Sequence, residues 1–371
     1  MRSRMSGVCR PSTIGLLAAG LLITTSLGAV AQDAATLDPD ADLSAQSLVI
    51  SNWAAYMPED LPANFEGEVG TPVTVTYHAT NEEIMAKLTA GGDSGIDVAF
   101  VSGQFAQALG EAGLLEPIHH DLVPNIANLY PEASELAYDP GNVWSVPYSW
   151  GTTGLCYRED LVSEAPDSWY DLLTPAEDVT GKTTMLATER WLMLPAQKAL
   201  GFSANTTDPA EMDQVKQLLS ATKPTLLAYD DTTFYSRLVS GEASLVQAWD
   251  GWCNYGIADE AVGSQIKFVV PSEGSDLWAD TMVILKTSKN KEAAHAFIDY
   301  ILRPDVHSWV VENILYKVPN QAAMEMMDAS LVEAFPNLGM TPAELLAQES
   351  LVDLGEAAPL YTQIATEIAA Q

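Results

Sequence analysis

The segment NEEIMAKLTAGGDSGIDVAFVSGQFAQALGEAG, at residues 81–113, decides the fold class. Its start predicts a helix over Asn81–Leu88, because Asn81 can cap the helix and two glutamates follow in the first turn. The apolar run Ile96–Val101 then predicts a buried strand, and Gln104–Ala112 returns to helical spacing. A strand between two helices is typical of an α/β protein with parallel or mixed sheets.

The same alternation continues on both sides of this segment. We expect further strands at 47–50, 73–77, 154–157, 244–248, 266–270 and 282–285. We expect further helices at 191–200, 208–219, 233–239, 251–258, 291–302 and 304–312. With 47% apolar residues, a chain of this length can bury a large core and should divide into two domains. In open α/β sheets, ligands bind at the carboxyl ends of the strands.

The N-terminus has the three parts of a secretory signal. Three arginines in the first ten residues precede an apolar stretch at 14–27, and Ala29-Val30-Ala31 follows it. We therefore predict a signal peptide at 1–31, cleavage after Ala31 and a periplasmic protein. The apolar stretch is short of the ~20 residues of a membrane span, which makes a retained anchor the weaker alternative.

Acidic residues dominate the remaining chain. Removing residues 1–31 takes away three of the 17 basic residues and none of the 50 acidic ones, so the net charge becomes 14 − 50 = −36. Such a chain repels nucleic acid, and we expect no nucleic-acid partner. Residues 32–46 are acidic and poor in large apolar groups, which predicts a flexible leader.

Neither the cysteines nor the histidines form a metal-binding pattern. Cys156 and Cys253 remain after cleavage, and a disulfide and two buried thiols fit the sequence equally well. No Cys-x-x-Cys or His-x-x-x-His occurs, so we expect no metal and no cofactor. The sequence also lacks Gly-x-Ser-x-Gly and a Gly-rich phosphate loop, and we expect no catalytic residue. A secreted glycoside hydrolase is the remaining enzyme alternative, because tryptophans and paired carboxylates also suit sugars.

Aromatic residues gather at the ends of the predicted strands, with acids between them. The aromatic residues are Trp53, Tyr56, Trp144, Tyr148, Trp150, Trp249, Trp252 and Trp278. The acids are Asp250, Asp280 and Glu189, which stands two residues before Trp191. An alkylammonium ligand needs both groups, because aromatic faces attract the cation and a carboxylate neutralises its charge. The alternative is ordinary packing, since tryptophans near strand ends often belong to the core.

Beyond this pattern, the sequence resembles a known family from about Ser47 to its C-terminus. The stretches that carry the resemblance are SNWAAYMPEDL, NEEIMAKLTAGG, IDVAFVSGQF, WSVPYSWGTTGL, NTTDP, QAWDG, VVPSEGSDLWAD, LRPDV and YKVPNQAA. They look like the spermidine/putrescine-binding proteins of bacterial ABC transporters. The resemblance implies a two-lobed periplasmic-binding-protein fold of type II, with two parallel or mixed sheets flanked by helices and joined by a hinge.

The resemblance also implies where the lobes lie and which partners the protein has. Lobe 1 comprises 47–150 plus 281–320 and lobe 2 comprises 151–279 plus 321–371. The chain crosses between the lobes near 149–153, 278–280 and 319–323. The expected partners are a small cationic amine and an ABC permease and ATPase complex in the inner membrane, and we expect a monomer.

Seven ligand-binding residues follow from the resemblance by position. They are Trp53, Tyr56, Ser102, Trp249, Trp278, Asp280 and Tyr316. Asp250 is placed to supply a second acid beside Trp249. The sequence departs from the family where its second-lobe acids fall on Thr188 and Trp191, and where a contact serine becomes Asp231. Glu189 can replace those acids only if the loop shifts.

Arg190 separates two classes of ligand. A guanidinium directed at the ligand would oppose a second ammonium but would clamp a carboxylate, as a short ω-amino acid such as 4-aminobutyrate requires. A guanidinium directed elsewhere is an ion-pair or surface group. The sequence therefore predicts a polyamine-binding protein, with an ω-amino acid as the alternative ligand.

Overall fold

The computed structural model describes residues 37–371, of which Asp38–Gln371 form one compact unit. The predicted signal peptide at 1–31 and residues 32–36 of the predicted leader lie outside the described residues. Gln46, in the described part of the leader, contacts the body of the protein. Its side chain donates to Glu292 at 3.2 Å and accepts from the Ala293 amide at 3.1 Å.

The described residues form an eleven-stranded mixed sheet with the main order β2-β1-β3-β10-β5-β8-β6-β7. β4 and β11 pair with β10, and β9 pairs with β5. The strands are β1 (Leu48–Asn52), β2 (Val73–Tyr77), β3 (Val98–Ser102), β4 (Leu115–Glu116), β5 (Ser145–Arg158), β6 (Thr183–Met185), β7 (Ala228–Tyr229), β8 (Leu245–Trp249), β9 (Ile266–Val269), β10 (Asp276–Leu285) and β11 (Glu349–Ser350).

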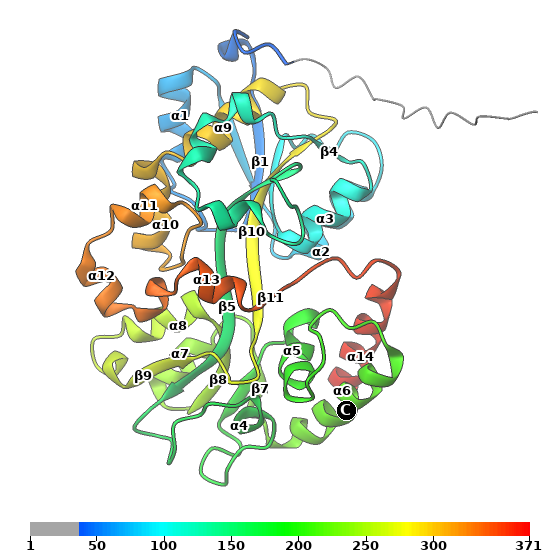
Figure 1. Cartoon of the computed structure of the whole chain (residues 1–371), viewed down its shortest axis with the longest axis vertical. Helices are drawn as coiled ribbons and strands as arrows, with labels where there is room; N and C mark the ends of the chain where they lie inside the picture. Colours follow the sequence, from blue (N-terminus) through cyan, green and yellow to red (C-terminus); the bar gives the residue numbers. More distant parts are fainter. Residues whose placement is uncertain (1–36) are drawn as a thin grey trace, which may run out of the picture. The chain divides into compact units, whose positions relative to one another are not determined.

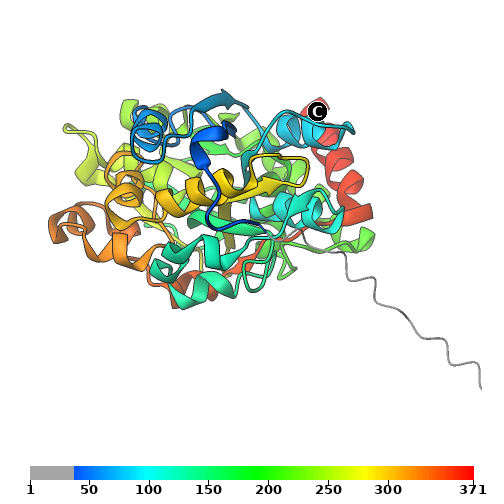
Figure 2. The same cartoon turned by 90° about the horizontal axis from the view of Figure 1, so that it is seen from above.

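Helices cover both ends of this sheet. They are α1 (Leu61–Val69), α2 (Asn81–Thr89), α3 (Gly103–Glu111), α4 (Trp169–Leu173), α5 (Glu189–Ala199), α6 (Pro209–Thr222), α7 (Phe234–Ser240), α8 (Asp250–Ile257), α9 (Lys291–Ile301), α10 (Pro304–Asn313), α11 (Gln321–Glu325), α12 (Ala329–Ala334), α13 (Pro342–Leu346) and α14 (Ala358–Ala370). Helix α14 packs on α5 and α6, at the opposite side from α11 and α12 (Figures 1 and 2). Within residues 37–371, no helix is long and apolar enough to cross a membrane.

Two long strands join the halves of the sheet. The first part of β5 pairs antiparallel with β10, and its last part pairs with β8 and β9. Figure 1 shows β5 and β10 running side by side through the middle of the fold. The two expected sheets are therefore joined through β5 into one continuous hydrogen-bonded sheet.

These strands are longer than the sequence indicates. The strand predicted at 154–157 is the end of β5, and the strand predicted at 282–285 is the end of β10. Trp278 and Asp280 do not precede the strand, as the sequence suggests, but lie inside β10. The predicted crossings at 149–153 and 278–280 are therefore extended strands, and the exact lobe boundaries stay a prediction.

A disulfide links the sheet to a helix. Cys156 of β5 and Cys253 of α8 are bonded, and their Cα atoms lie 5.8 Å apart. Of the two alternatives open from the sequence, the structure contains the bridge. Both residues are fully buried.

Candidate ligand-binding site

Asp280 lies at the junction of three strands. Its strand β10 places it opposite Ser102 of β3 and Ser149 of β5. The Ser102 hydroxyl donates to Asp280 Oδ1 and the Tyr56 hydroxyl donates to Oδ2, each at 2.7 Å. Burial raises the pKa of the Asp280 carboxyl, and these two hydrogen bonds oppose the rise. Three of the predicted site residues are thus in direct contact.

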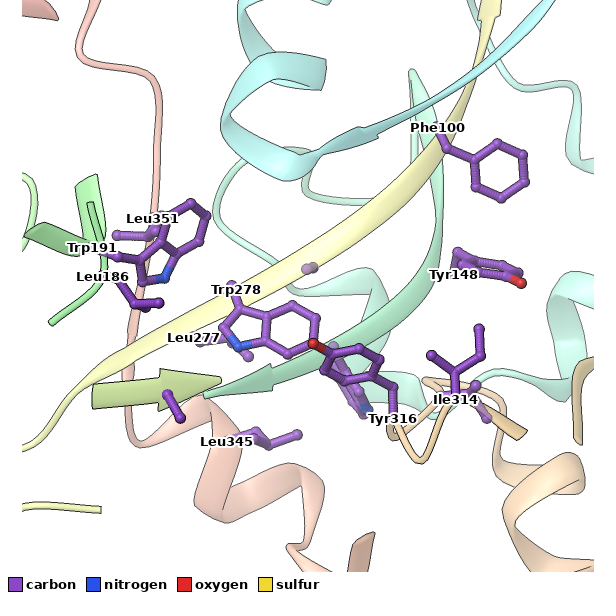
Figure 3. Close-up of a cluster of buried hydrophobic side chains, with 14 of the residues drawn as sticks. Phe100, Tyr148, Leu186, Trp191, Leu277, Trp278, Ile314, Tyr316, Leu345 and Leu351 are labelled. Atoms are coloured by element: carbon purple, nitrogen blue, oxygen red, sulfur yellow. The ribbon is translucent and has the colours of Figure 1, made fainter. Parts of the chain in front are cut away.

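Four predicted aromatic residues form a continuous series beside Asp280. The Trp53 ring meets Tyr56 edge-on with centroids 5.4 Å apart, and Tyr56 meets Tyr316 at 6.2 Å. Tyr316 meets Trp278 edge-on at 5.4 Å. Figure 3 shows Trp278 and Tyr316 with Trp191 among the buried side chains. Tyr56 thus connects the carboxylate of Asp280 to a series of four aromatic rings.

The backbone at both tyrosines of this series is unusual. Ala55, before Tyr56, has φ of 57°, and Leu315, before Tyr316, has φ of 59°. Non-glycine residues avoid this left-handed region unless the surrounding contacts impose it. One such contact is the Tyr148 hydroxyl, which donates to the Tyr56 carbonyl at 2.6 Å. The two tyrosine rings themselves meet with centroids 6.2 Å apart.

Two glycines allow the aromatic rings to lie against the backbone. A Cβ atom at Gly151 would stand 2.4 Å from the Trp278 ring and 2.5 Å from Asp250 Oδ1. A Cβ atom at Gly251 would stand 2.1 Å from the Tyr316 ring. Only glycine fits at such distances. Trp278, Asp250 and Tyr316 consequently pack around these two positions.

Asp250 is a second acid next to this series. It begins α8, is 3% exposed, and accepts from the Gly251 amide at 2.8 Å and the Thr152 amide at 3.4 Å. Burial raises the pKa of Asp250 to about 7; Asp276 adds to the rise and Lys317 opposes it. A cation bound nearby would favour the ionised form of Asp250.

Lys317 is a buried base that the sequence analysis did not single out. It is 4% exposed, and its ammonium donates to the carbonyls of Leu338 and Met340. Burial lowers the pKa of Lys317 to about 8. Its hydrogen bonds go to these backbone carbonyls. Its interaction with Asp250 is an electrostatic attraction without a hydrogen bond.

Three further predicted residues, Asp231, Glu189 and Arg190, lie at the start of α5. The Asp231 carboxylate accepts from the Ala187 amide at 2.7 Å and from Thr188, so it holds the turn that precedes this helix. Burial raises the pKa of Asp231. Glu189 accepts from the Thr362 hydroxyl of α14 at 3.1 Å, and burial raises its pKa as well. The structure therefore places these two acids in contacts with the turn before α5 and with α14.

The guanidinium of Arg190 is directed at the C-terminal segment. It donates to the Val352 carbonyl at 2.8 Å, the Ala204 carbonyl at 3.3 Å and the Asn205 side chain, and it lies 5.5 Å from the centroid of the Tyr361 ring. Within the described part of the chain, none of its hydrogen bonds reaches the Asp280 group. Burial lowers the pKa of Arg190. Its role in the structure is to hold the segment after β11.

Trp249 stands at the end of β8, beside a residue that the sequence analysis did not include in the site. Its ring centroid is 5.4 Å from that of Trp191, at 85°. The Trp191 indole N–H donates to Asp276 Oδ2 at 2.8 Å. Asp276, Trp278 and Asp280 alternate along β10 and share one face of the strand. This period of two could have identified Asp276 from the sequence, had the strand been predicted to begin before Met282.

The described residues contain no group of three or more His, Cys, Asp or Glu side chains that could hold a metal ion. The groups that the described contacts bring together at the site are carboxylates, hydroxyls and aromatic rings. Such a site can pair with one ammonium at Asp280 and surround a methylene chain with aromatic carbon.

Comparisons with known proteins give the same classification. The family model for bacterial extracellular solute-binding proteins matches residues 61–313. The spermidine/putrescine-binding periplasmic protein of Salmonella typhimurium is 31% identical over 351 residues, which cover 94% of this chain and 95% of that protein. The protein of the same name from Escherichia coli is 32% identical over 313 residues, covering 84% and 85%. A putrescine/agmatine-binding protein of Pseudomonas aeruginosa is 31% identical and covers 91% and 92%.

Solved structures agree with the fold. A spermidine/putrescine ABC transporter substrate-binding protein from Streptococcus pneumoniae superposes with a TM-score of 0.75 at 27% identity, covering 88% of this chain and 99% of that one. A spermidine/putrescine ABC transporter protein from Listeria monocytogenes gives a TM-score of 0.78 at 28% identity, covering 87% and 99%. The fold is that of the two-lobed periplasmic binding proteins, as predicted. The match over most of the chain shows that this protein belongs to the family of bacterial extracellular solute-binding proteins.

Proposed function

We propose that this protein binds a polyamine of the putrescine or spermidine type and delivers it to an ABC importer. The observation that carries the proposal is the contact of Asp280 with Tyr56 and Ser102 inside the aromatic series. Curated relatives at about 31% identity are named for spermidine and putrescine binding, which supports the same ligand class. The protein is a solute-binding protein and not an enzyme, so the glycoside hydrolase alternative falls away.

The acids of the site account for the charge of such a ligand. A desolvated ammonium is costly without a carboxylate, and Asp280 provides one that two hydroxyls hold in place. Asp250, buried beside Trp249, provides a second. Trp53, Trp278 and Trp249 offer aromatic carbon to the methylenes between two ammonium groups. Glu189 and Asp231 are proposed as acids for the far end of a longer polyamine.

The contacts of Arg190 favour a polyamine over an ω-amino acid. A carboxylate at the far end of 4-aminobutyrate would need a free guanidinium fork. Arg190 instead donates to Val352, Ala204 and Asn205. The amino-acid alternative would require Arg190 to leave these partners.

The transport partners follow from the family. Substrate-binding proteins of ABC importers bind small ligands and work with a membrane permease and ATPase, and the relatives are periplasmic. For this chain we propose export to the periplasm with cleavage after Ala31, action as a monomer, and closure of the two predicted lobes around the ligand. Contacts from both lobes would then hold the closed state.

Isothermal titration calorimetry of the purified protein tests the ligand class. Putrescine, spermidine and 4-aminobutyrate are titrated separately at one pH and one salt concentration. The proposal expects saturable binding of at least one polyamine and much weaker binding of 4-aminobutyrate. Binding of the zwitterion alone, lost on Arg190→Ala, would replace the polyamine with the amino acid.

A further inference from the structure

Asp276 is a fully buried acid outside the predicted ligand contacts. It is 0% exposed at the start of β10. Its Oδ1 accepts from the Thr153 amide at 3.0 Å and from the Ser275 hydroxyl at 3.3 Å. Its Oδ2 accepts from the Trp191 indole N–H at 2.8 Å. A buried carboxyl group is costly, and this one makes a specific hydrogen bond to an aromatic side chain.

The start of α5 is fixed at a second point. The Gln247 side chain, 0% exposed in β8, donates to the Trp191 carbonyl at 2.6 Å. It also accepts from the Leu186 amide at 3.1 Å. Both the backbone and the indole of Trp191 are therefore anchored, by Gln247 and by Asp276.

The anchored indole of Trp191 lies against the ligand-side tryptophan. Its ring meets Trp249 nearly at right angles, with centroids 5.4 Å apart. Trp191 is 7% exposed, whereas Trp249 is partly exposed. Trp249 is also paired in register with Thr153, the residue whose amide binds Asp276. These contacts close a ring of four residues: Asp276, Trp191, Trp249 and Thr153.

We infer that Asp276 is a positioning residue, which holds Trp191 behind Trp249 and so fixes the aromatic wall that covers the methylene chain of the polyamine. The inference rests on the proposed function, because it assigns Trp249 to the ligand. Asp276 touches no ligand in this scheme and acts through Trp191. An edge-to-face pair keeps its geometry only when neither ring can rotate, and the N–H bond to Asp276 prevents rotation of Trp191.

The test is a double-mutant cycle between Asp276 and Trp249, in which calorimetry measures the putrescine affinity of each variant. Asp276→Leu removes the acceptor while keeping the branched shape of the side chain, and it should weaken putrescine binding about three- to tenfold, the size of one lost aromatic contact. Asp276→Asn keeps an acceptor oxygen for the indole and should restore affinity to within about twofold of wild type. In a Trp249→Ala background, Asp276→Leu should change affinity by less than about twofold.

Thermal unfolding of the same variants separates this role from a purely structural one. Asp276→Leu should shift the melting temperature by a similar amount with Trp249 present or absent, while its effect on affinity depends on Trp249. Should Asp276→Leu fail to fold, Trp191→Phe serves in its place, because it removes the indole N–H that binds Asp276 together with the five-membered ring that carries it. Wild-type affinity in the folded variant, or an equal loss of affinity in both backgrounds, overturns the inference.

If the proposed function itself is wrong, the experiment gives a different result. In that case wild-type protein binds no polyamine at all, and the cycle is read from the near-UV circular dichroism of the tryptophans. Non-additive changes for Asp276→Leu and Trp249→Ala support the coupling, and additive changes contradict it.

Discussion

The hydroxyl of Tyr56 donates a hydrogen bond to Oδ2 of Asp280 at 2.7 Å, although 224 residues separate the two in the chain. The loop after β1 and the middle of β10 are thereby joined at the carboxylate. Ser102, at the end of β3, completes the arrangement from a third strand. Because β10 also pairs with β5, the proposed amine anchor stands on a long strand that runs through both halves of the sheet.

Removing the Tyr56 hydroxyl should weaken ligand binding. Tyr56→Phe keeps the ring but deletes a hydrogen bond that lowers the pKa of Asp280, so the carboxyl is less readily ionised. We expect putrescine affinity to fall by about three- to tenfold, the size of one ordinary intramolecular hydrogen bond, because Tyr56 bonds to Asp280 and not to the ligand itself. Calorimetry at two pH values measures this loss of affinity, and the loss should be larger at the lower pH. Tyr130→Phe, a tyrosine stacked on Trp150, is the control and should leave affinity unchanged.

Asp250 should make stability depend on pH. Its pKa is raised to about 7 in the folded protein and lies near 3.9 in the unfolded chain. The protonated form is favoured by folding, so its stabilising contribution is complete below about pH 4 and is lost as pH rises through about 7. Relative to Asp250→Asn, wild type should lose at most about 1.4 kcal/mol per pH unit over this window.

Urea unfolding at pH 5, 6 and 7 measures this difference. Asp160→Asn is the control, because Arg158 lowers the pKa of the exposed Asp160 carboxyl. The contribution of Asp160 is lost only at acid pH, so its difference from wild type should stay constant between pH 5 and 7. A constant difference for Asp250→Asn as well would refute the raised pKa.

Local signals predicted the regular elements well. Helix α2 has the predicted glutamates in its first turn, but its cap is Thr80 and not the predicted Asn81, which is the first residue of the helix. Strand β3 is buried along its whole length. Both features depend on neighbouring residues and are visible in the sequence. No element was predicted after Glu312. The sequence analysis missed α14, although it is 13 residues long, and it missed α11, α12 and α13, which are only five or six residues long. Such segments are too short for a helical period to be read.

The start of β10 could not be predicted for a tertiary reason. Asp276 and Asp280 interrupt its apolar pattern, and the segment is extended because β3, β5 and β11 pair with it. Asp280, Tyr56 and Ser102, three residues inferred from the resemblance, are in contact with one another, and their role in ligand binding stays a prediction. The orientation of Arg190 was open, since its partner Val352 lies 162 residues away in a segment without a predicted element.

The disulfide should contribute strongly to stability. Cys156 and Cys253 close a loop across a separation of 97 residues, and linking them restricts the unfolded chain. Replacing both by serine should lower the free energy of unfolding by roughly 2–5 kcal/mol. Chemical unfolding of the double variant measures the loss, and reduced wild-type protein should match it. Identical unfolding of all three samples would show that the bridge is absent or contributes nothing.

Arg190 should matter for stability and not for polyamine binding. Arg190→Gln removes hydrogen bonds to Val352 and Asn205 and should cost about 1–3 kcal/mol. Putrescine affinity should stay within about twofold of wild type, as measured by calorimetry below the melting temperature. A large loss of affinity with unchanged stability would place the guanidinium at the ligand.

The most direct test of the proposed amine site is the heat of putrescine binding to Asp280→Asn. Asp299→Asn is the matched control, because Asp299 also accepts two hydrogen bonds, from the amide and the side chain of Asn125, and burial raises its pKa too. Loss of the carboxylate that pairs with the ammonium should weaken binding by about ten- to hundredfold, while Asp299→Asn binds as wild type does. Equal affinity of Asp280→Asn, Asp299→Asn and wild type would contradict the assignment of Asp280 to the amine.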